Sequence, residues 1–400
     1  MTKFSAQCIS TAELIAAGAL EIGDGYRAKN LELAPIGIPF ARVKNLNNGF
    51  DFTDADLLPL SAINRVGTKT SCPGDCVLTS KGSVGRVAYV GPDTPRFVYS
   101  PQLSYWRSLD LEVIHPQYLR YWLQGPEFVI QRDAVKGSTD MADYVNLRDQ
   151  RRMTISLPPL STQRKIAAIL SAYDDLIENN NRRIKLLEEM AQRIYREWFV
   201  VFRFPGHENI PLVHSELGPI PSGWKVSRLG DAVEFVYGKA LKAGARRNGE
   251  VTVFGSGGAI GYHDEALAEG PGIVVGRKGN VGSVYWSNGA FFAIDTTYWI
   301  RSTLALTYCY YALCDMEFLD SHAAVPGLSR EQAYSLPLVV PESKVIAMFD
   351  GLALQLFALC GRIADATDNL RITRDLLLPR LISGEVEVTD LDIAIPEAAA

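Results

Sequence analysis

Two short segments with the same pattern carry the best candidates for ligand contact in this 400-residue chain. Lys81–Gly85 reads Lys-Gly-Ser-Val-Gly, and Lys278–Gly282 reads Lys-Gly-Asn-Val-Gly. A long cation beside a glycine turn can approach a phosphate closely, and Ser83 or Asn280 can form a hydrogen bond to the edge of a nucleic-acid base. The alternative is that each turn only closes a hairpin and its lysine is solvated. The residues leave both interpretations open.

Further cations extend this set of candidate nucleic-acid contacts. Arg86 and Arg277 flank the two turns, whereas Arg42 and Lys44 lie upstream and are weaker candidates because exposed charges are usually only solvated. The pair Arg246-Arg247 is weaker for the same reason. The candidate contacts are therefore Arg42, Lys44, Lys81, Gly82, Ser83, Arg86, Arg277, Lys278, Gly279 and Asn280.

The sequence patterns of common catalytic and metal sites are absent. Phe254–Gly258 resembles a cofactor loop but has Ser256 where a second glycine is needed, and Gly276–Lys278 lacks the remaining residues of a P-loop. The cysteine spacings are not those of zinc sites, and the five histidines are scattered. We therefore expect a binding protein with no catalytic residue, no cofactor and no metal.

Composition sets broader limits. The chain has 40 Lys+Arg and 45 Asp+Glu, so its net charge of −5 argues weakly against nucleic acid. The acidic excess lies in residues 341–400, which leaves room for local basic clusters elsewhere. No stretch approaches about 18 uninterrupted apolar residues, and the N-terminus lacks the features of a signal peptide. We expect a cytoplasmic protein.

The chain repeats itself, and the repeat shows which elements position the two turns. Each turn lies between two segments rich in β-branched residues, as in a hairpin. Further matches follow in the same order, which favours a duplicated β-rich domain over two unrelated ones. The matches are Tyr105-Trp106 with Tyr298-Trp299, Tyr118–Leu123 with Tyr308–Leu313, and Leu147 with Leu328, which precede Leu157 and Leu338 by ten residues.

A long helix is predicted after each copy. Apolar residues alternate at spacings of four and three, which is the seam of a coiled coil. The first seam is Ile166, Leu170, Tyr173, Ile177, Asn180, Ile184, Leu187, Ala191, Ile194 and Trp198. The second seam is Val345, Phe349, Leu352, Leu356, Leu359, Ile363, Ala366, Leu370, Thr373 and Leu377.

The two helices have apolar stripes that must be buried. Because a domain separates them in sequence, the second helix can return beside the first and run antiparallel to it, and Asn180 is expected to fix the register. The alternative is that each helix packs on its own domain. The fold class is thus α+β, with two similar β-rich domains and two long helices. The predicted segments are domain 1 (1–155), a central helix (156–200), domain 2 (201–340), a C-terminal helix (341–387) and a tail (388–400).

Two similar domains on a rigid spacer suit a target with two sites at a fixed separation, such as duplex DNA. Several segments then carry a specific resemblance. They are Leu157–Ala167, Leu186–Ala191, Arg196–Gly206, Pro221–Asp231 and Leu377–Glu387. Together they resemble the specificity subunit of type I restriction–modification systems over essentially the whole chain. One departure is visible, because the second helix is preceded by Leu338–Lys344 without the Pro-Pro-Leu-x-x-Gln form of the first.

The resemblance implies a non-catalytic DNA reader. Each domain would be a target-recognition domain that reads one half of a bipartite, asymmetric site in double-stranded DNA. The helices would recruit two adenine-methyltransferase (modification) subunits, and restriction subunits would join them. AdoMet is then expected in the methyltransferase subunits, and ATP and Mg²⁺ in the restriction subunits. The alternative is a scaffold, or decayed paralogue, that binds methyltransferase subunits without reading DNA.

Overall fold

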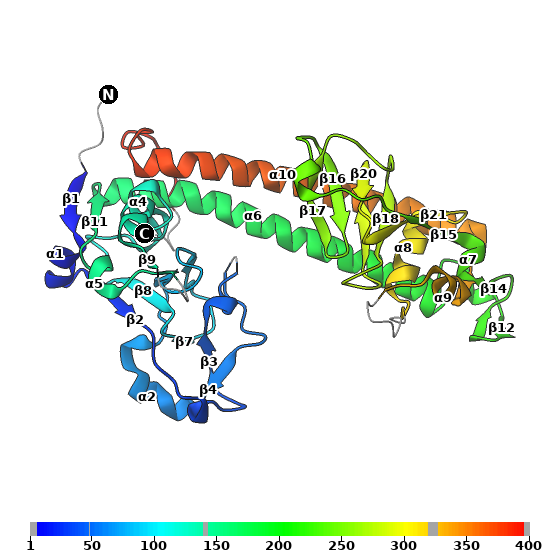
Figure 1. Cartoon of the computed structure of the whole chain (residues 1–400), viewed down its shortest axis with the longest axis horizontal. Helices are drawn as coiled ribbons and strands as arrows, with labels where there is room; N and C mark the ends of the chain where they lie inside the picture. The colour runs from blue at the N-terminus through cyan, green and yellow to red at the C-terminus, as the bar shows by residue number, and fades with distance from the viewer. Residues whose placement is uncertain (1–5, 48, 139–142, 319–326, 396–400) are drawn as a thin grey trace. The chain divides into compact units, whose positions relative to one another are not determined.

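The computed structural model describes residues 6–47, 49–138, 143–318 and 327–395 (Figure 1). The chain forms two compact units. Unit 1 comprises Met1–Glu178 with Asp368–Ala400, and unit 2 comprises Asn179–Thr367. The long helices α6 (Leu160–Tyr195) and α10 (Ser343–Ile382) each contribute to both units. They begin just after the two β-rich regions, within the segments predicted to be helical.

Unit 1 contains the first β-rich domain. Its main sheet has four antiparallel strands, a second sheet has three strands, and a strand pair joins the two ends of the domain. The main sheet is β2 (Leu20–Asp24), β8 (Leu103–Ser108), β5 (Cys76–Thr79) and β6 (Val87–Tyr89). The second sheet is β4 (Asp56–Leu58), β3 (Ile38–Ala41) and β7 (Val98–Tyr99), and the strand pair is β1 (Gln7–Ser10) with β11 (Thr154–Leu157).

Unit 2 repeats this topology strand for strand, so the predicted duplication is confirmed. In both second sheets the central strand has one antiparallel and one parallel neighbour. The main sheet is β15 (Val233–Tyr237), β21 (Thr297–Ser302), β18 (Gly272–Gly276) and β19 (Val284–Ser287). The second sheet is β17 (Gly258–His263), β16 (Val251–Gly255) and β20 (Phe291–Ala293), and the strand pair is β14 (Lys225–Arg228) with β22 (Pro337–Val340).

Short helices cover the sheets at matching places in the two domains. The matching pairs are α1 (Thr11–Ala16) with α7 (Leu229–Ala232), α3 (Pro116–Trp122) with α8 (Leu306–Cys314), and α5 (Leu147–Gln150) with α9 (Arg330–Ser335). Among the residues that the structure describes, the elements without a described counterpart are α2 (Ile63–Val66), α4 (Pro126–Val135), the pair β9 (Gly137–Ser138) with β10 (Asp143–Tyr144), and the hairpin β12 (Leu212–Ser215) with β13 (Gly218–Pro221).

In each domain, one tyrosine of the helix that follows the main sheet forms a hydrogen bond with the strand pair. Tyr118 of α3 donates a hydrogen bond to the carbonyl of Ser156, at 2.7 Å. Tyr308 of α8 donates to the carbonyl of Val339. Ser156 and Val339 hold the same place in the strand pairs, opposite Cys8 and Val226. The match between Tyr118–Leu123 and Tyr308–Leu313 is therefore confirmed.

Strand register corrects another match by one residue. Tyr105 lies opposite Gly23 and Val77, and the residue at this place in unit 2 is Trp299, opposite Val236 and Val274. Since successive residues of a strand point to opposite faces, a shift of one residue exchanges the faces. Tyr105 and Trp299 thus face the second sheets, whereas Trp106 and Tyr298 pack against the helices.

A third match is wrong by two residues. The amide of Val145 donates to the carbonyl of Ser80, and the amide of Leu328 donates to the carbonyl of Arg277, the corresponding place beside the second turn. Val145, not Leu147, is therefore the counterpart of Leu328. The ten-residue spacing itself is preserved, because Ile155 and Leu338 are both buried ten residues later.

The helices α6 and α10 run antiparallel within each unit, as predicted. In unit 1, Ile166 and Leu170 near the start of α6 share a core with Leu378 and Leu381 near the end of α10. In unit 2, residues near the end of α6 share a core with residues near the start of α10, namely Ala191 and Tyr195 with Phe349, Ala353 and Phe357. The pairing of long helices within the predicted fold class is confirmed.

The buried stripe of α10 differs from the predicted seam. Leu352 is 43% exposed, whereas Ala353 is 1% exposed and Thr367 is buried in place of the exposed Ala366. Val345, Phe349 and Ile363 are buried, and Leu356, Leu359, Leu370 and Leu377 are half-buried. The buried residues thus follow Phe349 and Ile363 by four positions, not three. The seam was predicted in the wrong phase at these positions.

In α6 the predicted stripe is closer to the observed one. Ile166, Leu170, Ile177 and Ala191 are buried, and Tyr173, Ile184, Leu187 and Ile194 are half-buried. Asn180 is half-buried and accepts a hydrogen bond from Arg183 of the same helix at 3.5 Å. Within unit 1 an ion pair links the two helices, with Arg374 Nη1 2.6 Å from Asp174 Oδ1. Asp174 also pairs with Arg120 and accepts a hydrogen bond from Tyr121, so it ties α3 to both long helices.

Within the described residues, α10 is also the one helix long and apolar enough to cross a membrane. Its apolar side chains include Phe349 and Ala353, which pack in the core of unit 2, and Leu381 and Ile382, which pack in the core of unit 1. This packing accounts for the apolar stripe.

Candidate nucleic-acid interface

The two Lys-Gly turns have the same backbone geometry. Gly82 and Gly85 have φ of +87° and +101°, and Gly279 and Gly282 have φ of +82° and +77°. Side chains other than glycine rarely adopt these values, which explains why both turns carry two glycines. Each turn closes by the same hydrogen bond, from the Gly85 amide to the Thr79 carbonyl (3.0 Å) and from the Gly282 amide to the Gly276 carbonyl (2.9 Å).

The lysines of the two turns are exposed and have no ion-pair partner in the described part of the chain. Lys81 forms a β-bridge with Tyr144, and Lys278 forms the corresponding bridge with Gly327. These bridges hold the backbone while the side chains stay free. Ser83 and Asn280 are exposed as well. Of the candidate contacts, these four side chains are the ones available for a ligand without breaking an interaction.

The remaining candidate cations are already engaged. Arg42 forms an ion pair with Asp56 at 2.8 Å and lies over the ring of Phe40, and the Lys44 ammonium donates to the Asp54 carbonyl at 2.7 Å. Arg86 donates to the carbonyl of Leu46 at 3.3 Å. Arg277 donates to the Asp295 carbonyl at 3.1 Å. These contacts position the cations, but only the Arg42 contact neutralises a charge.

The weaker pair Arg246-Arg247 is also occupied. Arg247 bridges Asp264 and Glu265 at 2.7 and 2.6 Å, and Arg246 donates to the Ile260 carbonyl at 2.6 Å. Hydrogen bonds from Arg247 lower the pKa of Asp264, which keeps this ion pair charged. The pair therefore serves the loop it belongs to.

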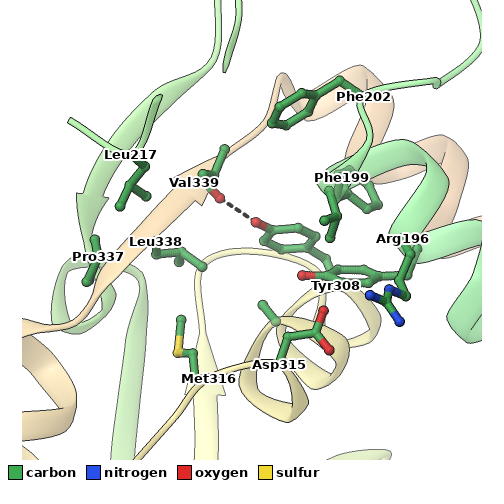
Figure 2. A pocket seen from close by; sticks show the side chains of 13 residues that line it. Arg196, Phe199, Phe202, Leu217, Tyr308, Asp315, Met316, Pro337, Leu338 and Val339 are labelled. Atoms are coloured by element: carbon green, nitrogen blue, oxygen red, sulfur yellow. Dashed lines mark hydrogen bonds between the residues drawn. The ribbon is translucent and has the colours of Figure 1, made fainter. Parts of the chain in front are cut away.

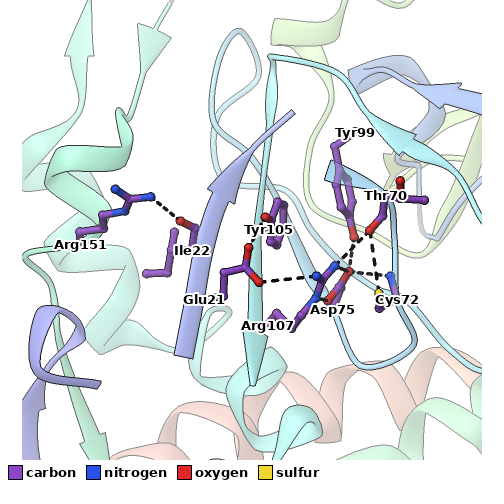
Figure 3. Close-up of polar contacts among 9 residues, drawn as sticks. All are labelled: Glu21, Ile22, Thr70, Cys72, Asp75, Tyr99, Tyr105, Arg107 and Arg151. Carbon is purple, nitrogen blue, oxygen red and sulfur yellow. Dashed lines mark hydrogen bonds and ion pairs between the residues drawn. The ribbon is translucent and has the colours of Figure 1, made fainter. Parts of the chain in front are cut away.

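Domain 1 contains a buried ion-pair network that the sequence analysis missed (Figure 3). Asp75 is fully buried, and Arg107 of β8 contacts both of its carboxylate oxygens, at 2.6 and 2.7 Å. The Tyr99 hydroxyl and the Cys72 amide donate to the same carboxylate, at 2.5 and 2.8 Å. Burial and this neighbouring carboxylate raise the pKa of Tyr99, so its hydroxyl stays protonated. The network ties the start of β5 to β8 within the main sheet.

Unit 2 has a cavity of about 550 Å³ beside the last turn of the helical segment Arg196–Val200 (Figure 2). Most of the residues that line it are apolar or aromatic, and Arg196 and Asp315 are the charged ones. The Tyr308 hydroxyl in the wall is committed to the Val339 carbonyl, and burial raises the pKa of Tyr308. The cavity therefore offers no nucleophile paired with a base.

The described residues form no metal site. No group of three or more His, Cys, Asp or Glu side chains there could hold a metal ion. Burial raises the pKa of the Cys309 thiol to about 11, which keeps it protonated and unreactive.

The comparisons with known proteins agree on one family. A family profile described as "Type I restriction modification DNA specificity domain" matches residues 20–189 and 221–346. The chain belongs to this family. The type I restriction enzyme MjaIX specificity subunit of Methanocaldococcus jannaschii is 26% identical over 350 residues, which cover 80% of this chain and 79% of that protein. The MjaVIII specificity subunit of the same organism is 30% identical over 131 residues, 33% of this chain and 29% of that protein.

A solved structure supports the fold of this specificity subunit. The S subunit of a type I restriction–modification system from M. genitalium matches with a TM-score of 0.59 at 15% identity, covering 95% of this chain and 97% of that one. The family resemblance inferred from the sequence is thus confirmed. A specificity subunit is the non-catalytic member of its complex, so family membership also confirms that this chain is not itself an enzyme.

Proposed function

We propose that this specificity subunit reads a bipartite, asymmetric site in double-stranded DNA, with one half-site read by each β-rich domain. The observation that carries the proposal is that the two domains share a framework but differ at the loop surface around their Lys-Gly turns. At corresponding places, Ser83 faces solvent in domain 1 and Asn280 in domain 2. A shared frame with different base-contacting groups suits two different half-sites.

The proposal extends to the partners. The long helices would hold two methyltransferase subunits, with restriction subunits joining them, and residues 1–155 and 201–340 would be the target-recognition domains. AdoMet would bind in the methyltransferase subunits, and ATP and Mg²⁺ in the restriction subunits. The target adenine would leave the helix and enter a methyltransferase pocket, at a cost of a few kcal/mol. This chain would supply position only, in the cytoplasm.

A single-molecule map of N6-methyladenine in the native genome, with and without this gene, tests the proposal. Loss of methylation at one split motif is the expected result, and it identifies both half-sites. An unchanged map, with the partner methyltransferase expressed, would overturn DNA reading and leave a scaffold that only binds methyltransferase subunits. Exchanging Ser83 and Asn280 is the sharper second test, because only the two half-sites, and not the amount of methylation, should change.

A further inference from the structure

The surface beside the turn of domain 2 carries a cluster of cations that domain 1 lacks. Arg277 and Arg330 both lie over the ring of Tyr237, with their guanidinium carbons 4.9 and 4.4 Å from the ring centre. Lys278 and Lys239 are exposed in the neighbouring backbone segments, and the backbones of Lys239 and Arg277 contact Ala293 and Thr296, close together in the chain. We call Lys239, Arg277, Lys278 and Arg330 the domain 2 cation cluster.

None of these four cations forms an ion pair within residues 6–47, 49–138, 143–318 and 327–395. Arg277 and Arg330 donate to backbone carbonyls, those of Asp295 and Phe235, at 3.1 and 3.4 Å. Their charges are therefore positioned by aromatic and backbone contacts but not neutralised. Tyr237, which holds both guanidinium groups, is itself 45% exposed, so the cluster faces solvent.

The corresponding surface of domain 1 carries fewer unpaired cations. Shared hydrogen bonds and register place Ser80 at the position of Arg277, Asp24 at that of Tyr237, and Tyr26 at that of Lys239. Helix starts place Leu147 at the position of Arg330. Only Lys81, the counterpart of Lys278, is a cation. Asp24 adds a negative charge, which Lys69 neutralises at 2.7 Å.

We propose that domain 2 supplies most of the sequence-independent phosphate contact of this subunit, through Arg277, Lys278 and Arg330, whereas domain 1 has only the cation of Lys81 at the corresponding positions. The proposal rests on the DNA-reading function proposed above. Arginine suits this role because its planar group can contact two phosphate oxygens at once while its flat face rests on an aromatic ring. Phosphate contacts position a protein on DNA and carry no base preference.

Salt dependence of binding measures such contacts directly. Each phosphate contact contributes about 0.9 to the slope of log K against log salt on duplex DNA. We expect the variant Arg277→Gln/Lys278→Ala/Arg330→Gln to lower that slope by up to about 2.7, and Lys81→Ala to lower it by at most about 0.9. The assay uses the full chain assembled with its methyltransferase subunits, on a duplex that carries the methylated motif and on one that lacks it.

Two control variants separate charge from folding. Arg277→Lys/Arg330→Lys retains both charges and should keep a slope close to that of the wild type. Arg301→Gln removes a cation from the other end of β21, where Arg301 lies 3.8 Å from Glu234, and should leave the slope unchanged. The methylated motif should be the same for every variant that binds.

The outcomes are distinguishable. Motif-dependent binding with equal slope losses for the triple variant and Lys81→Ala would overturn this inference and leave the proposed function intact. A wild-type complex that binds both duplexes equally would overturn the proposed function and, with it, the inference. If Arg277→Lys/Arg330→Lys lowered the salt slope as much as the triple variant does, the effect would come from the shape of the arginine side chains and not from their charge. That result would also overturn the role proposed for the charges.

Discussion

Removal of Arg107 should destabilise unit 1 far more than removal of Arg301 destabilises unit 2. The two arginines occupy the same position in their sheets, one residue after Trp106 and Ile300, which lie opposite Ile22 and Phe235. Their environments differ. The side chain of Arg107 is 13% exposed and pairs with the fully buried Asp75, whereas that of Arg301 is 62% exposed and lies 3.8 Å from Glu234. The pair is therefore a matched comparison of a buried and an exposed ion pair.

The magnitude follows from what each substitution leaves behind. Arg107→Ala leaves the Asp75 carboxylate buried with only the Tyr99 hydroxyl and the Cys72 amide as donors. Breaking a buried pair in this way costs about 3–5 kcal/mol, while an exposed pair contributes about 0–1 kcal/mol. Arg107→Lys keeps the charge but loses the two-pronged contact, so its effect should fall between these values.

Hydrogen exchange followed by mass spectrometry on the full chain resolves the two units separately. In Arg107→Ala, the amides of β5 and β8 should lose about a hundredfold or more of their protection, because about 1.4 kcal/mol corresponds to a factor of ten. Arg301→Ala should leave the amides of β18 and β21 within about tenfold of the wild type. Equal losses in the two sheets, or no loss in unit 1, would refute the assignment of Asp75 and Arg107 as a buried, mutually dependent pair.

Three further predictions concern the helices and the sheets. Ala353→Asp should destabilise unit 2 by several kcal/mol because Ala353 is 1% exposed, whereas Leu352→Asp should be tolerated. Denaturant unfolding measures both variants, and the reverse order of stability would restore the seam predicted from the sequence. Gln163→Ala should reduce stability by about 1–3 kcal/mol or more, since the side-chain amide of Gln163 forms hydrogen bonds with the backbone of Val113, His115 and Pro158. Ile346→Val, at the matching position of α10, should reduce it by about 0.5–1.5 kcal/mol. Equal small effects would contradict a stabilising role for these hydrogen bonds. Burial and a hydrogen bond to Glu21 raise the pKa of Tyr105 to about 12, so its contribution to stability is complete below pH about 10, the unfolded value, and is lost as the pH rises to about 12. Tyr105→Phe should make the loss of unit 1 stability across this pH window less steep, because burial also raises the pKa of Tyr89 to about 12 and that residue remains. An unchanged profile would exclude Tyr105 as a contributor.

The duplicated fold could be predicted from the sequence because the glycines of the two turns and the tyrosines Tyr118 and Tyr308 recur in the same order in both copies. Register could not be predicted to the residue. Tyr-Trp occurs in both copies, at 105–106 and 298–299, yet the strands align Tyr105 with Trp299. Both residues of each pair are aromatic and at least partly buried, so the sequence gives no sign of which faces the helices.

The phase of the second helix was ambiguous for a similar reason. Apolar residues follow Phe349 at both three and four positions, as Leu352 and Ala353; spacing and size favour Leu352, but the smaller Ala353 is the buried one. Small residues permit closer approach of helices, and this preference is not visible in a spacing count. Likewise, Asp174 and Arg374 are 200 positions apart, so only the fold brings them together.

The ion pairs of Arg42, Arg107 and Arg247 show that the sequence does not reveal which cations are already paired within the fold. Their partners are Asp56, Asp75 and Asp264, which are 14 to 32 positions away and follow no local spacing rule. The unpaired Lys81 and Lys278 were identified because a glycine turn predicts exposure directly. Free cations in tight turns are thus more predictable than free cations elsewhere.

The strand pairs β1–β11 and β14–β22 have an evolutionary consequence. Neighbouring strands lie about 5 Å apart, so the first and last residues of each domain are close together in space. Everything between Ser10 and Thr154, or between Arg228 and Pro337, can therefore be exchanged by recombination as one block, provided that the incoming segment ends in two strands of the same register. Such an exchange leaves the start of α6 or α10 in place. Under the proposed function, a lineage would then acquire a new half-site in one genetic event, without changing the helices that partner subunits would have to recognise.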